Sequence, residues 1–547
     1  MAGDPESSFF RRTGLLLPAV LAPIAETGLV RGFTPASAAL APQVTAPPPF
    51  DLFHDLRWVS VFHNSWWTLA AELIGVLVLR SMWMAWVVQR SWPRSELPPM
   101  RAAAFRVSLY YVAATVLFIP WVVILFGLAF SHLSFLFFGA LPPALALAVV
   151  IGRGAASQAA GYLWAWRPSW RSLAWVLAAF VWLTLSGAVT GTAPWPVALL
   201  AAGLAGLLNA RALFGVVQDI ALGPKRRALP ALTPALIVGV FAVAFGGTAI
   251  GFAVTVGHGT EEPTGRGPAP AAVPGEHPVL VAAGLHSHYD PRPPLGLPLG
   301  YVGWRYSYKG LDEKGRPLPY EPEDTQQSLL LSARRMGKQV HRLSHAYREP
   351  VTLVAESEGA LVARTYLTSV YRPAGHEVDR LITLDMPSGV SGVYFPPRGK
   401  QGWGVGSGWG LRGLTNVLEA MAPLQLSVDS GLGRDFTDCR ALLSRLAMSP
   451  PPPGVQEVSF QALSDWVDPA NAAPGVSTIL VNVPHGGLVS RTGIQALIQS
   501  ILDGDAVLPT SSQGGILARF VHATARPWEV PSLPLSLDPR ATCSNGN

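Results

Sequence analysis

Long apolar runs in the first half of the chain limit its possible folds more than any other feature. Six runs of roughly 20 residues are each long enough to cross a bilayer as a helix; they cover residues 66–88, 107–130, 133–152, 172–190, 194–210 and 232–256. Lipid offers no water to the backbone, so apolar runs of this length are stable there as helices. We therefore predict a transmembrane domain of about six helices over residues 65–257.

The composition agrees with a membrane protein. Hydrophobic residues make up 50% of the chain and charged residues 14%, which is unusual for a soluble protein. A net charge of +6 also occurs in nucleic-acid-binding proteins, but the basic residues here recur between the apolar runs. We therefore expect the lipid bilayer, and no nucleic acid, as a partner.

The charges between the runs predict the orientation of the chain. The first, third and fifth connections carry Lys and Arg, whereas the second and fourth carry neither; the basic residues are Arg90, Arg94, Arg101, Arg153, Arg167, Arg171, Arg211, Lys225, Arg226 and Arg227. The positive-inside rule places basic connections in the cytoplasm. We expect an integral protein of the cell membrane whose second half lies outside the cytoplasm.

The N-terminal segment, residues 1–64, has two interpretations. A weaker apolar run from Gly14 to Ala25 follows Arg11 and Arg12. It is either an additional membrane span or a signal peptide, with a small-residue cleavage candidate at 36–38. Both remain open, and we favour the uncleaved membrane segment.

Two charged residues, Glu72 and Arg80, lie inside the first run. Charges within a membrane span are by default a sign of function. We interpret them instead as structural: Arg80 extends to the cytoplasmic face and Glu72 bonds to a neighbouring helix. No run has a repeated pattern of acidic, basic or His residues, so a transporter is not favoured.

The second half of the chain has the pattern of an α/β domain. A linker rich in Gly and Pro covers residues 258–277. Strands are then expected at 277–283, 301–308, 351–355, 380–385, 457–463 and 478–483, with helices from Asp324 or Thr325 to about Ala346, from Ala360 onward, and from about Leu488 to Leu502. This alternation predicts a mainly parallel sheet with helices on both faces over residues 278–510, followed by a tail, residues 511–547.

The segment Ala355-Glu356-Ser357-Glu358-Gly359 is the strongest functional signal. It lies between an apolar strand and a helix, and its central Ser is flanked by small residues. A sharp turn from strand to helix holds such a Ser hydroxyl out at the edge of the sheet, as in a nucleophile elbow. Ala355 replaces the usual first glycine.

Residues 278–505 resemble the α/β-hydrolases of the bacterial lipase and esterase kind. The motifs that carry this resemblance are 283–285, 305–308, 355–359, 384–387, 464–469 and 484–488. The resemblance implies a nucleophile at Ser357 and a general base at His485, which follows the last predicted strand. It also implies the chain order Ser, acid, His.

Three carboxylates compete as the acid that orients His485. Asp465 begins Asp-Trp-Val-Asp-Pro and resembles the acid loop of the family, so it is our choice. Asp468 lies in the same loop, and Asp385 ends an earlier strand, a position that some lipases use. The resemblance also implies an oxyanion hole formed by the backbone N–H groups of Glu358 and Leu285.

Three further features are less decisive. His286 and His288 have no convincing third ligand, so we expect neither metal nor cofactor. Residues 390–454 form an insertion that is either a cap over the site or a disordered loop. Cys439 and Cys543 are able to form one disulfide in an external compartment.

These features together predict a membrane-anchored extracytoplasmic serine hydrolase that cleaves an ester through Ser357, Asp465 and His485, and we expect a lipid ester as the substrate. An acyltransferase that uses the same acyl-enzyme is one alternative. A non-enzymatic membrane binding protein with a hydrolase-like domain is the other.

Overall fold

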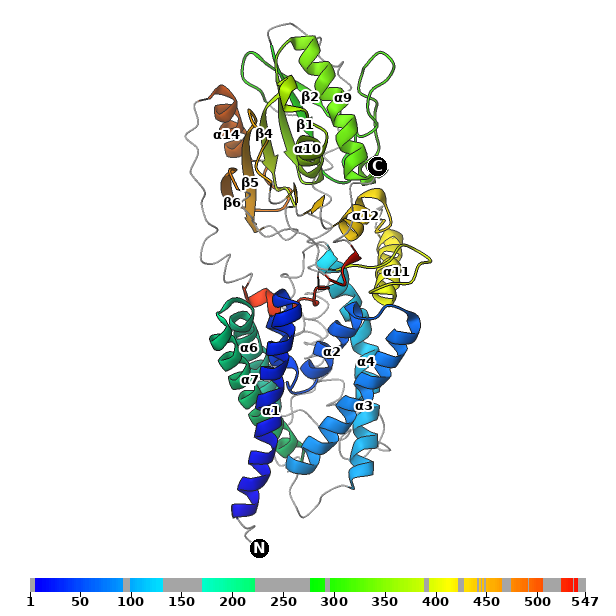
Figure 1. Ribbon diagram of the computed structural model, residues 1–547, viewed down its shortest axis with the longest axis vertical. Coiled ribbons are helices and arrows are strands. Elements are labelled where there is room, and N and C mark those ends of the chain that lie inside the picture. The colour runs from blue at the N-terminus through cyan, green and yellow to red at the C-terminus, as the bar shows by residue number, and fades with distance from the viewer. Residues whose placement is uncertain are drawn as a thin grey trace.

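The computed structural model describes residues 5–91, 99–130, 170–221, 276–290, 296–387, 393–421, 427–439, 442–443, 445–446, 449–464, 474–489, 491–504, 523–534 and 536–539. These residues form an elongated molecule with a helical bundle at one end and an α/β domain at the other (Figure 1).

The bundle contains long apolar helices. Its elements are α1 (Pro5–Phe33), η1 (Pro35–Gln43), α2 (Phe50–Val61), α3 (Trp66–Ser91), α4 (Met100–Phe130), α6 (Trp170–Thr192) and α7 (Trp195–Ala221). Four helices of the described chain are long and apolar enough to cross a membrane, and the bent pair Met100–Val116 and Phe118–Ala129 is a fifth if it forms one span. The predicted spans at 133–152 and 232–256 lie outside the described residues.

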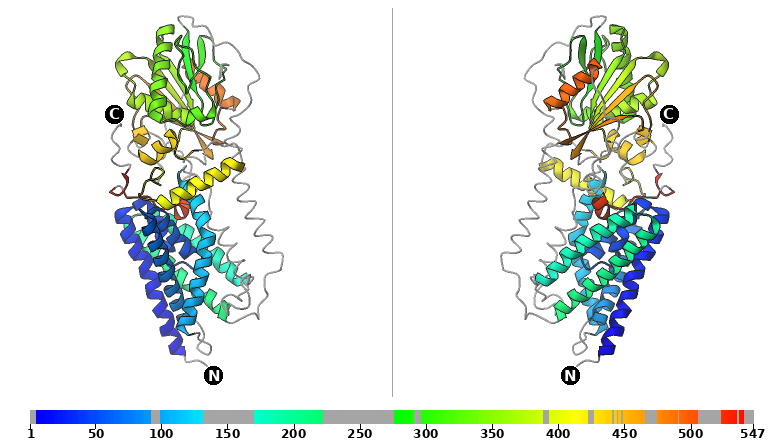
Figure 2. Two further views of the ribbon diagram at one scale, coloured as in Figure 1. Left: turned by 90° about the vertical axis from the view of Figure 1, so that its right-hand side faces the viewer. Right: turned by 90° about the vertical axis from the view of Figure 1, so that its left-hand side faces the viewer.

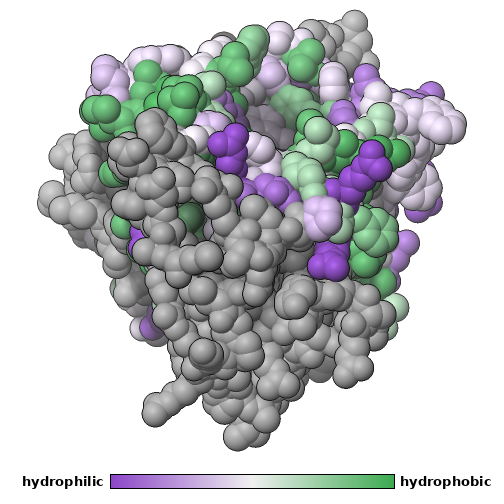
Figure 3. All heavy atoms as spheres, turned by 90° about the horizontal axis from the view of Figure 1, so that it is seen from below, coloured by the Kyte–Doolittle hydropathy of each residue, from purple (hydrophilic) through white to green (hydrophobic). Residues whose placement is uncertain are grey.

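Large apolar side chains cover the outside of the bundle. Figure 3 shows hydrophobic patches on its flanks when the molecule is seen from the end opposite the α/β domain. The exposed residues include Leu21, Leu29, Ile74, Leu79, Met82, Phe105, Val116, Val181, Leu200 and Leu204. Contiguous apolar surface of this kind on long helices is typical of contact with lipid.

Helix α1 is an integral part of the bundle. It packs so closely on α7 that a Cβ at Gly206 would lie 2.1 Å from the carbonyl oxygen of Ala19. Arg31, near the end of α1, donates a hydrogen bond of 2.6 Å to the carbonyl of Ala193. In the candidate cleavage segment, Ser37 Oγ accepts a 3.0 Å hydrogen bond from the N–H of Ser532. In the full chain, residues 5–43 are thus packed as part of the bundle, and the choice between a membrane span and a signal peptide stays a prediction.

The expectation for Arg80 in the first span was wrong, and that for Glu72 stays a prediction. Arg80 is buried and forms a bidentate ion pair with Asp55 of α2, with N–O distances of 2.5 and 2.6 Å. It therefore does not extend to the cytoplasmic face. His54 continues the network to Asp55 and Glu26, each at 2.8 Å. Within the described chain Glu72 has no hydrogen-bonding partner. The ion pair with Asp55 offsets the cost of removing the Arg80 charge from water. Asp55 lies on α2, a short buried helix whose sequence does not have the pattern of a membrane span.

The α/β domain has a six-stranded parallel sheet with the order β2-β1-β3-β4-β5-β6. Its strands are β1 (His277–Ala282), β2 (Tyr301–Arg305), β3 (Val351–Glu356), β4 (Val378–Leu384), β5 (Gln456–Ser464) and β6 (Ser477–Pro484). The predicted mainly parallel sheet is confirmed. Because the chain starts at β1, moves outward to β2 and returns to β3 beside β1, the strand order reverses between β1 and β3.

Helices cover both faces of the sheet (Figure 1). They are α9 (Leu329–Tyr347), α10 (Glu358–Ser369) and α14 (Thr492–Asp503). The domain also contains the short 3-10 turns η5 (Pro322–Gln326) and η6 (Pro373–Gly375), whereas the turn η7 (Arg526–Trp528) packs on the bundle. Leu280 and Leu353 pack with α9 and α10, whereas their neighbours Val281 and Val354 pack with α14. Alternate strand residues therefore serve two cores, as a pleated sheet requires.

Several predicted boundaries differ from the structure. Helix α9 begins after Ser328, whose Oγ accepts the N–H of Leu331, because Asp324 instead closes a capping box with Glu321 on the separate turn η5. Strand β2 ends at Arg305, and α14 begins at Thr492 rather than near Leu488.

The insertion joins the two halves of the molecule. Its described part contains α11 (Val405–Met421) and α12 (Gly431–Asp438), so the disordered-loop alternative is wrong there. Figure 2 shows α11 between the bundle and the α/β domain. His63 of the bundle accepts hydrogen bonds from the N–H groups of Gly404 and Gly406, at 2.8 and 2.7 Å. On the other side, Asp435 of α12 accepts the N–H of Leu329 at 2.5 Å.

The C-terminal tail also returns to the bundle. Trp528 is fully buried, stacks on Phe180 at 4.8 Å and donates a 2.9 Å hydrogen bond to Thr184. Cys439, next to α12, is disulfide-bonded. The other cysteine of the sequence, Cys543, lies outside the described residues.

Candidate active site

The turn after β3 has the backbone of a nucleophile elbow. Ser357 lies between β3 and α10 with φ 49° and ψ −117°, a conformation that non-glycine residues rarely adopt. Close packing requires small neighbours: a Cβ at Gly359 would lie 2.6 Å from the carbonyl oxygen of Ala282. A Cβ at Gly284 would lie 3.0 Å from Ser357 Cβ. The turn is therefore held by contact with the strand next to it.

The structure brings two predicted site residues together. Ser357 Oγ lies 3.0 Å from Nε2 of His485, which follows β6 directly and is half-buried. They are 128 residues apart in the chain. A hydroxyl and an imidazole at this distance are positioned for proton transfer from the nucleophile to the base.

Asp385 is the carboxylate that the structure describes beside this pair. It is 1% exposed and follows β4 with φ 51°. One carboxylate oxygen accepts the N–H of Gly486, the residue after His485, at 3.1 Å. The other accepts the N–H of Ala462 at 2.7 Å. The predicted acid Asp465 and its neighbour Asp468 lie outside the described residues.

The loop after β1 approaches the nucleophile from the neighbouring strand. Tyr308 donates a 2.8 Å hydrogen bond to the carbonyl of Ala283, and the N–H of His286 is bonded to Thr325 Oγ1 at 3.1 Å. These two bonds fix the backbone on both sides of Leu285. The loop and Ser357 thus lie where the strand order reverses, which is the usual ligand position at the carboxyl edge of a parallel sheet.

Glu358 is an unusual neighbour for a nucleophile. Its side chain is 3% exposed, and neither carboxylate oxygen has a hydrogen-bonding partner in the described chain. Burial raises the pKa of Glu358 well above its ordinary value, which favours the neutral form of the carboxyl group. A neutral Glu358 adds no negative charge next to the position where an oxyanion would form.

Glu356, on the other side of Ser357, responds differently. Burial raises the pKa of Glu356 to about 7, while the positive charges of His485 and Arg305 oppose that rise. Its charge therefore changes near neutral pH, within electrostatic reach of His485.

The expectation that His286 and His288 hold no metal stays a prediction. The His286 side chain is buried, its Nε2 has no partner among the described residues, and burial lowers the pKa of this imidazole. A separate cluster of His341, His345 and Glu377 occurs on the far side of the domain. Its two histidines lie four residues apart on a predicted helix, a spacing that indicates one shared helix face and that was missed from the sequence.

No protein-family model matches the chain, and no curated protein is significantly similar to it. The resemblance of residues 278–505 therefore rests on the motifs and on the geometry of this site.

The raised pKa of Glu358 predicts how stability depends on pH. Its pKa is higher in the folded than in the unfolded chain, where it is about 4.3. Above that pH the folded state binds more protons, so this group makes the free energy of unfolding fall as the pH rises, by at most about 1.4 kcal/mol per unit.

Glu358→Gln removes this dependence. The thermal midpoint of the variant minus that of the wild type should increase from pH 4.5 to pH 8, when both are measured as the full chain in detergent. Glu313→Gln, at an exposed position, is the matched control and should give a constant difference. A constant difference for Glu358→Gln would contradict a buried, protonated carboxyl.

Proposed function

We propose that the protein is a membrane-anchored serine hydrolase of the α/β-hydrolase type that cleaves carboxylic esters of lipids. The observation that carries the proposal is the 3.0 Å contact between Ser357 Oγ and His485 Nε2 at a turn with positive φ. Parallel strands, the elbow and the order of the motifs along the chain support the same family.

The reaction follows from this pair. Ser357 Oγ attacks the ester carbonyl carbon while its proton passes to His485 Nε2. The tetrahedral oxyanion lies toward the backbone N–H groups of Glu358 and Leu285. As the C–O bond breaks, the leaving alcohol takes the proton from His485, and the acyl group stays on Ser357. Water then attacks the acyl-enzyme with His485 as the base, which releases the acid and restores the Ser357 hydroxyl.

We assign the orientation of His485 to Asp385 rather than to Asp465. The carboxylate of Asp385 accepts a hydrogen bond from the backbone N–H of Gly486, which is the residue after His485 in the chain. Asp385 follows the end of its strand with a positive φ, as Ser357 does. Both side chains are displayed at the carboxyl edge of the sheet by the same kind of turn.

The arrangement of the two domains supports a lipid substrate. The start of α9, at the carboxyl edge of the sheet, bonds to α12, and the insertion then contacts the bundle. The site thus lies on the side of the α/β domain that faces the bundle (Figure 1). Trp409 of α11 is 43% exposed and Val417 is 55% exposed, which gives this junction apolar surface for an acyl chain.

The positions of basic residues support an extracytoplasmic site. Arg90 lies at the end of α3 and Arg101 at the start of α4. The opposite ends of both helices pack against α11, which lies between the bundle and the α/β domain (Figure 2). The positive-inside rule assigns the end that carries Arg90 and Arg101 to the cytoplasm, although Arg31 lies at the opposite end. The α/β domain then lies outside.

Replacement of the nucleophile tests the function. In membranes treated with a fluorophosphonate probe, the wild-type protein should be labelled and Ser357→Ala should not. Hydrolysis of an ester should fall to below about one thousandth. Ser369→Ala, an exposed serine on the same helix, should keep both. Unlabelled but folded wild-type protein would instead favour a binding role.

Asparagine variants test the choice of acid. Asp385→Asn should lower kcat by about 10⁴-fold, because an amide no longer stabilises the imidazolium that forms. Asp465→Asn should stay within about tenfold of the wild type. The reverse result, with both variants folded by thermal unfolding, would make Asp465 the acid.

A further inference from the structure

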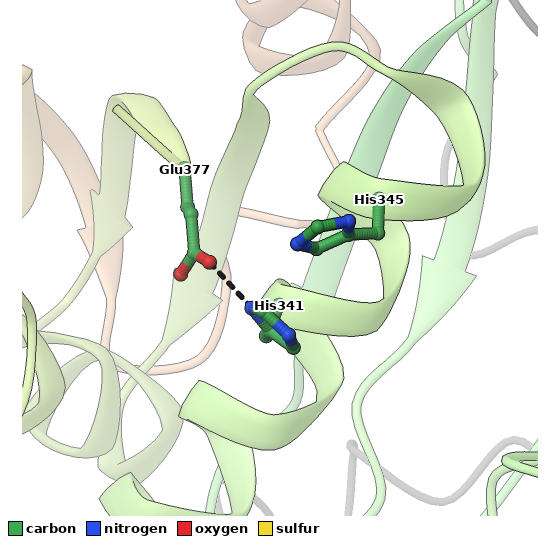
Figure 4. A group of neighbouring side chains, drawn as sticks. All are labelled: His341, His345 and Glu377. Atoms are coloured by element: carbon green, nitrogen blue, oxygen red, sulfur yellow. Dashed lines mark hydrogen bonds and ion pairs between the residues drawn. The ribbon is translucent and has the colours of Figure 1, made fainter. Parts of the chain in front are cut away.

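A cluster of metal-binding side chains lies outside the candidate active site. Figure 4 shows His341 and His345 on α9 beside Glu377, which precedes β4. His341 Nδ1 lies 2.6 Å from Glu377 Oε1, and the two imidazole rings are 4.4 Å apart. One ligand atom from each of the three residues lies within 4.8 Å of the others.

The fold holds these side chains together. Residues four apart lie on one face of a helix, and this face of α9 is exposed at His341 and His345 while Val340 and Leu343 are buried in the core. Glu377 is fixed through its backbone, because its carbonyl accepts the N–H of Val351 at 2.9 Å. The carboxylate is thus attached to the β3–β4 pair and the imidazoles to α9.

Two imidazoles and one carboxylate form a common ligand set for zinc. Zinc bonds of about 2.0–2.1 Å place tetrahedral ligands about 3.4 Å apart. The two histidines are exposed and Glu377 is half-buried, and side chains whose ligand atoms lie within 4.8 Å of one another reach this spacing by small rotations about their own bonds. We propose that His341, His345 and Glu377 bind Zn²⁺, with water completing the coordination.

This site has a structural role rather than a role in the ester chemistry. Val351 and Val378 begin β3 and β4 next to the cluster, whereas Ser357 follows the other end of β3. Six strand residues at about 3.3 Å each separate the two sites by roughly 20 Å. A bound ion would connect α9 to the starting ends of β3 and β4. Its binding to the folded state would stabilise the α/β domain by mass action.

The test uses the full chain in detergent, purified without a polyhistidine tag and stripped with a chelator. Zn²⁺ titration should show one site and raise the thermal midpoint. Cu²⁺ bound at the same site should give an electron paramagnetic resonance spectrum with two coordinated nitrogens. His345→Ala, which keeps the bond between His341 and Glu377, should leave one nitrogen and weaken Zn²⁺ binding by about 100-fold or more, since even outer-shell changes cost 10–100-fold.

His376→Asn is the matched control, because His376 is an exposed imidazole next to Glu377 that lies outside the cluster. It adopts a positive φ that Asn tolerates, so this variant should bind Zn²⁺ like the wild type. Equal Zn²⁺ affinity in the wild type and His345→Ala would overturn the proposal. A lack of Zn²⁺ binding at about 100 µM, roughly the highest dissociation constant expected of a specific site, would also overturn the proposal. Both results are independent of ester hydrolysis.

Discussion

The contact between the β3–α10 turn and the loop after β1 is the constraint on which the candidate site depends. Gly359 lies against the carbonyl of Ala282, and no larger residue fits there. This contact allows α10 to start directly after the strand and holds Ser357 at a positive φ. The same approach brings the loop at Gly284 next to the nucleophile. One packing requirement thus positions both the hydroxyl and the backbone proposed to stabilise an oxyanion.

The second feature of the molecule is its continuous connection to the bundle. The insertion bonds to the start of α9 on one side and to His63 on the other, and the tail inserts Trp528 between bundle helices. A single span would suffice as an anchor, so this extensive packing suggests that the bundle sets the position of the site relative to the lipid. The proposed lipid substrate follows from that placement.

Local patterns in the sequence predicted those features of the structure that depend on local interactions. The apolar runs, the parallel strands and the elbow depend on periodicity, on small residues and on a short turn, and the structure has all three in the described chain. The partners of buried charges depend on residues distant in the chain. Arg80 pairs with Asp55 on a short buried helix, and no spacing in the sequence indicates that contact. Asp385, one of the three candidate acids, bonds to Gly486, the residue after His485, because β4 and β6 lie on opposite sides of β5. The cap at Ser328 was missed because Asp324 has the same preference for a helix start.

The central claim is that Ser357 accepts an acyl group from a lipid. The most direct measurement is peptide mass spectrometry of the full chain in lipid nanodiscs, quenched with acid during turnover. The account predicts a fatty acyl group on the peptide that contains Ser357 and its loss in His485→Ala. Folded wild-type protein without this adduct, or an equal adduct in both proteins, would contradict acyl transfer to Ser357 with His485 as the base.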